Sequence, residues 1–218
     1  RSVRYVSNVI PRITMEGGLR YAHGSALLMD DARPAIEKQH QVNEIIKSRH
    51  PGALSLTYFH SYISTELGDI EKYAGTEARK PNGEVYDYHD PIYPLFIPTL
   101  ENSYGEAMVR VIDMMLDDVG FDGIYWDEMS HSANSWAFDF PEWDGCSAEI
   151  DAATGEITRK LSSVTILSQP FRQAMANRIL DAGKALVANG QPLTETMAGY
   201  HFPRYVETCT PAHLYAAQ

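Results

Sequence analysis

The chain has 218 residues, of which 44% are hydrophobic and 11% aromatic, a composition typical of a folded globular protein and not of a disordered one. Its formal net charge of −11 argues against binding to nucleic acid or to an anionic membrane, because both partners require a basic patch. No run of about 18 apolar residues is present, so we expect no membrane span.

The acidic balance favours a neutral or cationic substrate. The two cysteines, Cys146 and Cys209, lack metal-ligand spacing, and we expect two unpaired thiols, with a bridge between them as the alternative. Because the sequence begins at Arg1, it supports no prediction about a signal peptide. The sequence does not determine the oligomeric state or the cellular compartment, although a secreted or periplasmic location is favoured.

The first thirty residues are hard to assign, with residues 5–10 and 25–29 as candidates for an early strand. A helix is predicted to begin at Asp31, because an Asp cap is followed by an early proline, Pro34. A partial apolar stripe continues along this helix, which should end before Pro51.

The middle of the chain is predicted to alternate between strands and helices. Residues 53–60 are nearly continuously apolar or β-branched, which indicates a strand buried on both sides. After a long connection over residues 61–91, residues 94–98 are the next candidate strand, with prolines at both ends. Residues 103–119 carry apolar side chains at spacings of three and four, which predicts a core-facing helix, and a strand over residues 123–127 follows.

The last third of the chain begins with the segment 129–167, which is too long to be an ordinary strand-to-helix loop. Within them, residues 148–158 are predicted to form a hairpin. A helix over about residues 169–182, a strand over 185–189 and a short strand over 204–208 complete the pattern.

Alternating strands and helices predict a parallel sheet with right-handed crossovers. A closed (β/α)8 TIM barrel is favoured over an open sheet, because no glycine-rich phosphate loop follows a strand and because polar residues end three successive strands: Asp127, Asn189 and Glu207. We expect one catalytic domain over residues 1–218, incomplete or truncated, since only five or six strands are recognisable.

The segment Gly-Phe-Asp-Gly-Ile-Tyr-Trp-Asp-Glu, residues 120–128, places two adjacent carboxylates at the end of a buried strand. Side chains of a strand alternate between its two faces. Asp127 is therefore expected to share the inner face with Tyr125, and Glu128 to point with Trp126 towards the surrounding helices.

Residues 120–128, 186–190 and 205–208, taken in order, resemble the central strands of (β/α)8-barrel glycoside hydrolases. The similarity is to the broad group of α-galactosidase, α-glucosidase and endo-α-galactosaminidase-like enzymes, and it covers roughly residues 50–210. It implies a glycosidase that acts on an oligo- or polysaccharide and needs no cofactor and no metal.

Glycosidic bond cleavage requires an acid for the leaving oxygen and a second carboxylate. By resemblance Asp127 matches the nucleophile of a retaining enzyme and Glu207 the acid/base, with Glu128 as a rival for the acid. Further residues at the strand ends or in the long loop are expected to bind the sugar: Tyr58, His60, Tyr125, Asn189 and Trp136.

Structural roles are the alternatives at several of these positions. Asp127 and Glu128 could cap a helix or form ion pairs, Asn189 could form only an Asn-Gly turn, and Trp136 could belong to a hydrophobic lid.

Two other functions are compatible with the sequence. In a metal-dependent hydrolase or lyase, Asp127, Glu128 and His60 would bind a divalent ion, although the chain has no His-x-His or His-Glu-x-x-His motif. Alternatively, the chain is a non-catalytic carbohydrate-binding barrel or a fragment of a larger enzyme.

Overall fold

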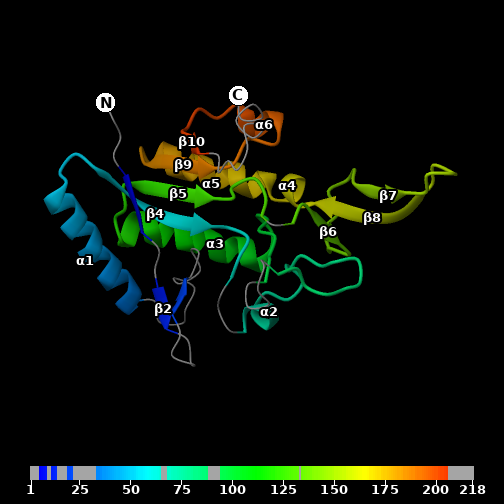
Figure 1. The fold of residues 1–218 in the computed structure, drawn as a ribbon, viewed down its shortest axis with the longest axis horizontal. Coiled ribbons are helices and arrows are strands. Elements are labelled where there is room, and N and C mark those ends of the chain that lie inside the picture. Colours follow the sequence, from blue (N-terminus) through cyan, green and yellow to red (C-terminus); the bar gives the residue numbers. More distant parts are fainter. Residues whose placement is uncertain are drawn as a thin grey trace.

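The computed structural model describes residues 5–8, 11–13, 19–21, 33–64, 68–87, 94–132 and 134–205. The largest sheet in this part of the chain has five parallel strands in the order β1-β4-β5-β9-β10 (Figure 1). These strands are β1 (Tyr5–Asn8), β4 (Leu54–His60), β5 (Gly123–Asp127), β9 (Ala185–Asn189) and β10 (Arg204–Tyr205).

The predicted (β/α)8 barrel is wrong. Over the described residues the sheet is open, with β1 and β10 at its two edges. Residues 94–98, predicted as a strand of this sheet, form only isolated bridges: Leu95 N–H donates to Tyr86 O and Phe96 N–H donates to Tyr62 O. The backbone bonds of this segment go to nearby loops, and proline at either end lacks the N–H that a continuous ladder needs.

The predicted helices are confirmed. They are α1 (Arg33–Arg49), α3 (Ser103–Asp113), which continues into the π-helical turn η2 (Met114–Asp118), and α5 (Gln169–Asp181). The Asn102 side chain caps α3 by accepting from Gly105 N–H at 2.8 Å, and Pro170 occupies the first turn of α5. None of the described helices is long and apolar enough to cross a bilayer.

The main core lies between one face of the sheet and the helices α3 and α5. Trp126 is completely buried there, edge-on to Phe59 and Phe171 at ring-centre distances of 5.1 and 6.2 Å. Burying an aromatic ring of this kind stabilises the fold by about 2–3 kcal/mol. Ile124 belongs to the same core, so the alternation predicted for β5 holds, and Asp127 lies on the face away from the helices.

The smaller elements lie around this sheet. The predicted hairpin is confirmed as β7 and β8, which with β6 form a three-stranded antiparallel arm that projects from the molecule (Figure 1). Cys146 at the base of the arm has a free, exposed thiol, whereas Cys209 lies outside the described residues, as do residues 25–29. The remaining elements are β2 (Pro11–Ile13), β3 (Leu19–Tyr21), α2 (Asp69–Lys72), β6 (Trp136–Phe138), β7 (Ala148–Ile150), β8 (Ile157–Ser163), α4 (Val164–Leu167) and α6 (Glu195–Ala198).

Asp144 fixes the base of this arm. Its carboxylate accepts from the N–H groups of Cys146 at 3.0 Å, Ser147 at 2.8 Å and Ser163 at 2.6 Å, and from the Ser147 hydroxyl at 2.6 Å. Burial raises the pKa of the Asp144 carboxyl, but these four hydrogen bonds outweigh it and hold the pKa below its usual value of 3.8.

The stability of the arm is therefore expected to depend on pH. Because the pKa is lowered in the folded state, the stabilisation is present above 3.8 and is lost as the pH falls through the folded-state pKa. Asp144→Asn should weaken the arm at neutral pH by about 1–2 kcal/mol. The variant should also lack the loss of stability at low pH, because the group that titrates is removed. Hydrogen exchange of the Ser147 and Ser163 amides measures both effects. Asp151→Asn, at the hairpin tip, is the control and should leave Ser163 unaffected.

Candidate functional site

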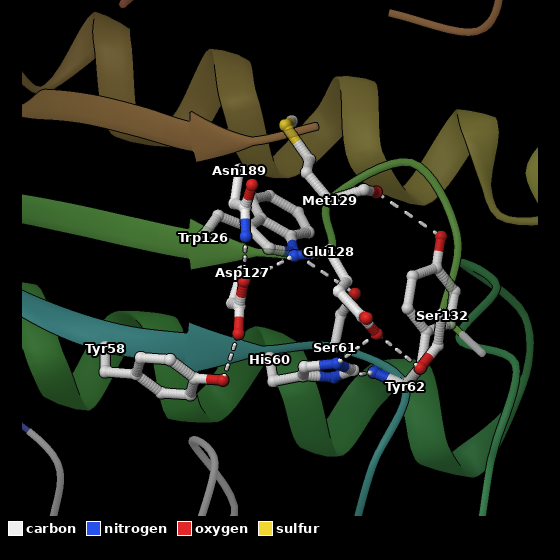
Figure 2. A network of polar contacts seen from close by, with 10 residues as sticks. All are labelled: Tyr58, His60, Ser61, Tyr62, Trp126, Asp127, Glu128, Met129, Ser132 and Asn189. Carbon is white, nitrogen blue, oxygen red and sulfur yellow. Dashed lines mark hydrogen bonds and ion pairs between the residues drawn. The ribbon is translucent and has the colours of Figure 1, made fainter. Parts of the chain in front are cut away.

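Polar side chains from three neighbouring strands meet at the carboxyl ends of β4, β5 and β9, with the Asp127 carboxylate at the centre (Figure 2). The Tyr58 hydroxyl donates to Asp127 Oδ2, and Asn189 Nδ2 donates to Asp127 Oδ1 at 2.6 Å. The Glu128 N–H donates to Oδ1 at 3.1 Å. All three groups donate to the carboxylate oxygens, so together they hold the carboxylate in one orientation.

An aromatic pair lies beside this carboxylate. Tyr58 and Tyr125 are paired across β4 and β5, with ring centres 6.0 Å apart and planes tilted by 42°. Both side chains are partly exposed, as is Asp127, while Asn189 is buried. The carboxyl ends of parallel strands are where open α/β sheets bind their ligands. A partly exposed carboxylate flanked by aromatic rings at this edge is a candidate site of that kind.

Glu128 does not point towards the helices, so that prediction from strand alternation is wrong. Its φ of 45° lies in the left-handed region, which is strained for a residue with a side chain by about 1–3 kcal/mol. The side chain turns instead to His60 at the end of β4, whose Nε2 lies 3.1 Å from Glu128 Oε2. The Ser132 hydroxyl donates to the same oxygen at 2.7 Å (Figure 2).

Two hydrogen bonds of the His60 ring identify its tautomer. The Tyr62 N–H donates to Nδ1 at 3.2 Å, so Nδ1 carries the lone pair and Nε2 carries the proton that is donated to Glu128. The His60 ring is 1% exposed, so both contacts are made in the interior of the protein.

The same contacts bear on the metal site suggested by the sequence. Both His60 ring nitrogens already take part in hydrogen bonds within the protein, so binding a cation through either nitrogen would break one of these contacts. Among the residues that the structure describes, no group of three or more His, Cys, Asp or Glu side chains is arranged to hold a metal ion.

A second layer of residues surrounds Glu128, and sequence reasoning missed it. Tyr62 OH lies 2.8 Å from Ser168 Oγ and 3.4 Å from Met129 O. Burial raises the pKa of the Tyr62 phenol; the Arg172 charge and the Ser168 hydrogen bond lower it, and the Glu128 charge raises it. No motif marks Tyr62, Ser132 or Ser168. Ser132 contacts a residue four positions before it, whereas the contact between Tyr62 and Ser168 joins residues 106 positions apart.

Six of the eight predicted site residues come together in this region: Tyr58, His60, Tyr125, Asp127, Glu128 and Asn189. Trp136 lies instead in β6 of the antiparallel arm, where its side chain is 47% exposed. Glu207 lies outside the described residues.

Comparison with known proteins identifies no family for the chain. No protein-family model matches the sequence, and no curated protein matches it significantly.

Proposed function

We propose that the protein is a glycoside hydrolase in which Asp127 is the nucleophile of a retaining mechanism. The observation that supports this most strongly is the Asp127 carboxylate itself, which three donors hold in one orientation at the carboxyl end of a central strand. An ionised carboxylate in a fixed orientation is the group that attacks an anomeric carbon.

The surroundings of Asp127 suit a sugar ring. The rings of Tyr58 and Tyr125 offer apolar faces on which the C–H face of a pyranose can pack. The Tyr58 hydroxyl and the Asn189 amide also orient the nucleophile. The net charge of −11 favours a neutral or cationic carbohydrate as the substrate.

In the contacts described above, the oxygens of Asp127 and Glu128 act as acceptors. Glu128 Oε2 accepts from both the His60 imidazole and the Ser132 hydroxyl. The general acid is therefore assigned to Glu207, the position that the resemblance implies. Glu128 contributes negative charge, which stabilises the positive charge that develops on the sugar in the transition state.

The reaction then has two steps. An Asp127 oxygen forms a bond to the anomeric carbon while Glu207 transfers its proton to the departing glycosidic oxygen. Water next attacks the same carbon, Glu207 takes a proton from that water, and the bond to Asp127 breaks. The anomeric configuration of the product is that of the substrate.

Two variants distinguish the candidate acids. Glu207→Gln should slow the cleavage of glycosides with poor leaving groups by about 10²- to 10⁴-fold, and should affect activated aryl glycosides much less, because these leave without protonation. Glu128→Gln should slow both substrate classes alike. The measurement is kcat/KM over a series of aryl glycosides, with product anomers followed by NMR.

Full activity of Glu207→Gln towards poor leaving groups would remove Glu207 from the acid role. A product with the inverted anomeric configuration would mean that Asp127 acts as a general base and not as the nucleophile. Binding of oligosaccharide without any turnover would support the non-catalytic carbohydrate-binding alternative instead.

A further inference from the structure

Arg172 is an unusual residue in the interior of the protein. It lies in the first turns of α5 and is completely buried. Its Nε donates to Ser168 Oγ at 3.3 Å and its Nη2 donates to Thr165 O, whereas Nη1 has no hydrogen-bond partner in the described part of the chain. Among the described residues no carboxylate contacts its guanidinium group. A buried cation without an ionic partner destabilises a fold, so stability alone does not explain Arg172.

The hydrogen bonds around Ser168 have a single consistent direction. The Ser168 hydroxyl donates its only proton to Val164 O at 2.7 Å. Its oxygen therefore accepts from Arg172 Nε and from the Tyr62 hydroxyl, which lies 2.8 Å away. The orientation of the Tyr62 side chain thus depends on an acceptor that Arg172 holds in place.

Tyr62 connects this group to the candidate site. Its N–H fixes the lone pair on His60 Nδ1, and His60 then donates from Nε2 to Glu128. The charges of Arg172 and Glu128 also act on the Tyr62 phenol with opposite signs. A chain of contacts therefore links Arg172 to the carboxylate: Arg172 and the Tyr62 hydroxyl both donate to Ser168, the Tyr62 backbone N–H donates to His60, and His60 donates to Glu128 (Figure 2 shows the part from Tyr62 onward).

A second connection runs through the loop that follows Glu128. Arg172 donates to Thr165 O, and the Thr165 hydroxyl donates to Ser130 O at 3.2 Å. The Ser130 hydroxyl in turn donates to Gln191 O at 2.6 Å, in the loop after β9. These contacts hold the backbone directly after Glu128, the residue with left-handed φ.

We infer that Arg172 is a positioning residue of the candidate site: it holds Ser168 and Thr165 so that Tyr62 keeps His60 in the Nε2–H tautomer and the loop keeps Glu128 turned towards it. The inference rests on the proposed function only for its effect on catalysis. The geometric part, the coupling of Arg172 to His60, is independent of what the site does.

The test is NMR of the full chain with ¹⁵N-labelled histidine, in which a His60→Gln variant identifies the His60 ring signals among those of the eight histidines. In the wild-type protein we expect separate signals for a protonated Nε2 and an unprotonated Nδ1. Arg172→Met replaces the guanidinium by an apolar chain. It should keep a cooperative unfolding transition, because the buried charge is removed together with the hydrogen bonds that it makes. The two His60 signals should move towards each other, as the tautomers exchange.

Tyr62→Phe keeps the backbone N–H but lacks the hydroxyl, and it should produce the same change at His60. The control is Arg178→Met, on the same helix: Arg178 pairs with Asp113 and Asp117 on α3 and η2 and has no part in the chain to His60. It should leave the His60 signals unchanged. Wild-type His60 signals in a folded Arg172→Met variant would overturn the inference, as would an equal change in Arg178→Met.

If the protein cleaves glycosides, Arg172→Met should also lower kcat by about 5- to 10-fold, with KM little changed, which corresponds to the loss of one hydrogen bond in the transition state. A shifted His60 spectrum in a protein that cleaves no glycoside would contradict the proposed function and leave the coupling intact. Unchanged spectra in an active glycosidase would contradict the coupling alone.

Discussion

Asp127→Asn is expected to reduce kcat/KM for glycoside cleavage on the order of 10⁴-fold, the scale seen when a reacting side chain is removed. The amide nearly preserves the shape of the carboxylate but cannot attack an anomeric carbon. It also presents an NH₂ group where Asp127 accepts from Tyr58 and Asn189, so one of these donors faces another donor. We therefore expect the free energy of unfolding to fall by about 1 kcal/mol.

The measurement is the rate with aryl glycosides, together with thermal unfolding to show that the variant is folded. Asp118→Asn is the matched control: Asp118 is an exposed aspartate at the end of η2, and its substitution should change neither quantity. A folded Asp127→Asn variant with wild-type turnover would exclude Asp127 as the nucleophile.

Gly123→Ala is expected to have a large effect on stability. Gly123 begins β5 and pairs with Ala185 of β9. A Cβ atom at this position would lie 2.0 Å from Ala185 O and 2.7 Å from Ala185 C, far inside van der Waals contact. Both atoms are backbone and cannot rotate away, so the two strands would have to separate at the start of their ladder. The free energy of unfolding should fall by about 4 kcal/mol or more.

Urea unfolding followed by circular dichroism measures this effect. Gly52→Ala serves as the control, because Gly52 lies in an exposed turn where an added Cβ would meet nothing within 4 Å. The free energy of unfolding of Gly52→Ala should stay within about 0.5 kcal/mol of the wild-type value. An equally small change in Gly123→Ala would mean that β5 and β9 do not approach each other as closely as described.

Local patterns predicted the elements of the fold well. The alternation along residues 123–127 located β5 and its two faces, and the apolar stripe over residues 103–119 predicted α3 together with η2. Sheet closure was mispredicted, because it depends on which strands pair, and pairing is a non-local property. Residues 94–98 illustrate this: an apolar run between two prolines has the composition of a strand, but its hydrogen bonds go to loops.

The candidate site was predictable to a similar extent. Carboxylate and amide groups at successive strand ends indicated that Asp127 and Asn189 lie together, and they are in contact. The direction of Glu128 was mispredicted, since alternation assumes extended backbone and this residue has a left-handed φ. Its contact with His60 joins residues 68 positions apart, and no spacing rule encodes such a distance.

The strand order has a consequence for how the protein is made. Each parallel strand lies beside the one that precedes it in the chain among the strands of this sheet, from β1 to β10. The sheet can therefore be extended at a single edge as the polypeptide leaves the ribosome, and no later strand has to insert between two earlier ones. The Tyr58 contact with Asp127 can form once β5 has emerged, and the Asn189 contact is added with β9. The strand order thus allows the site to assemble in the order of synthesis.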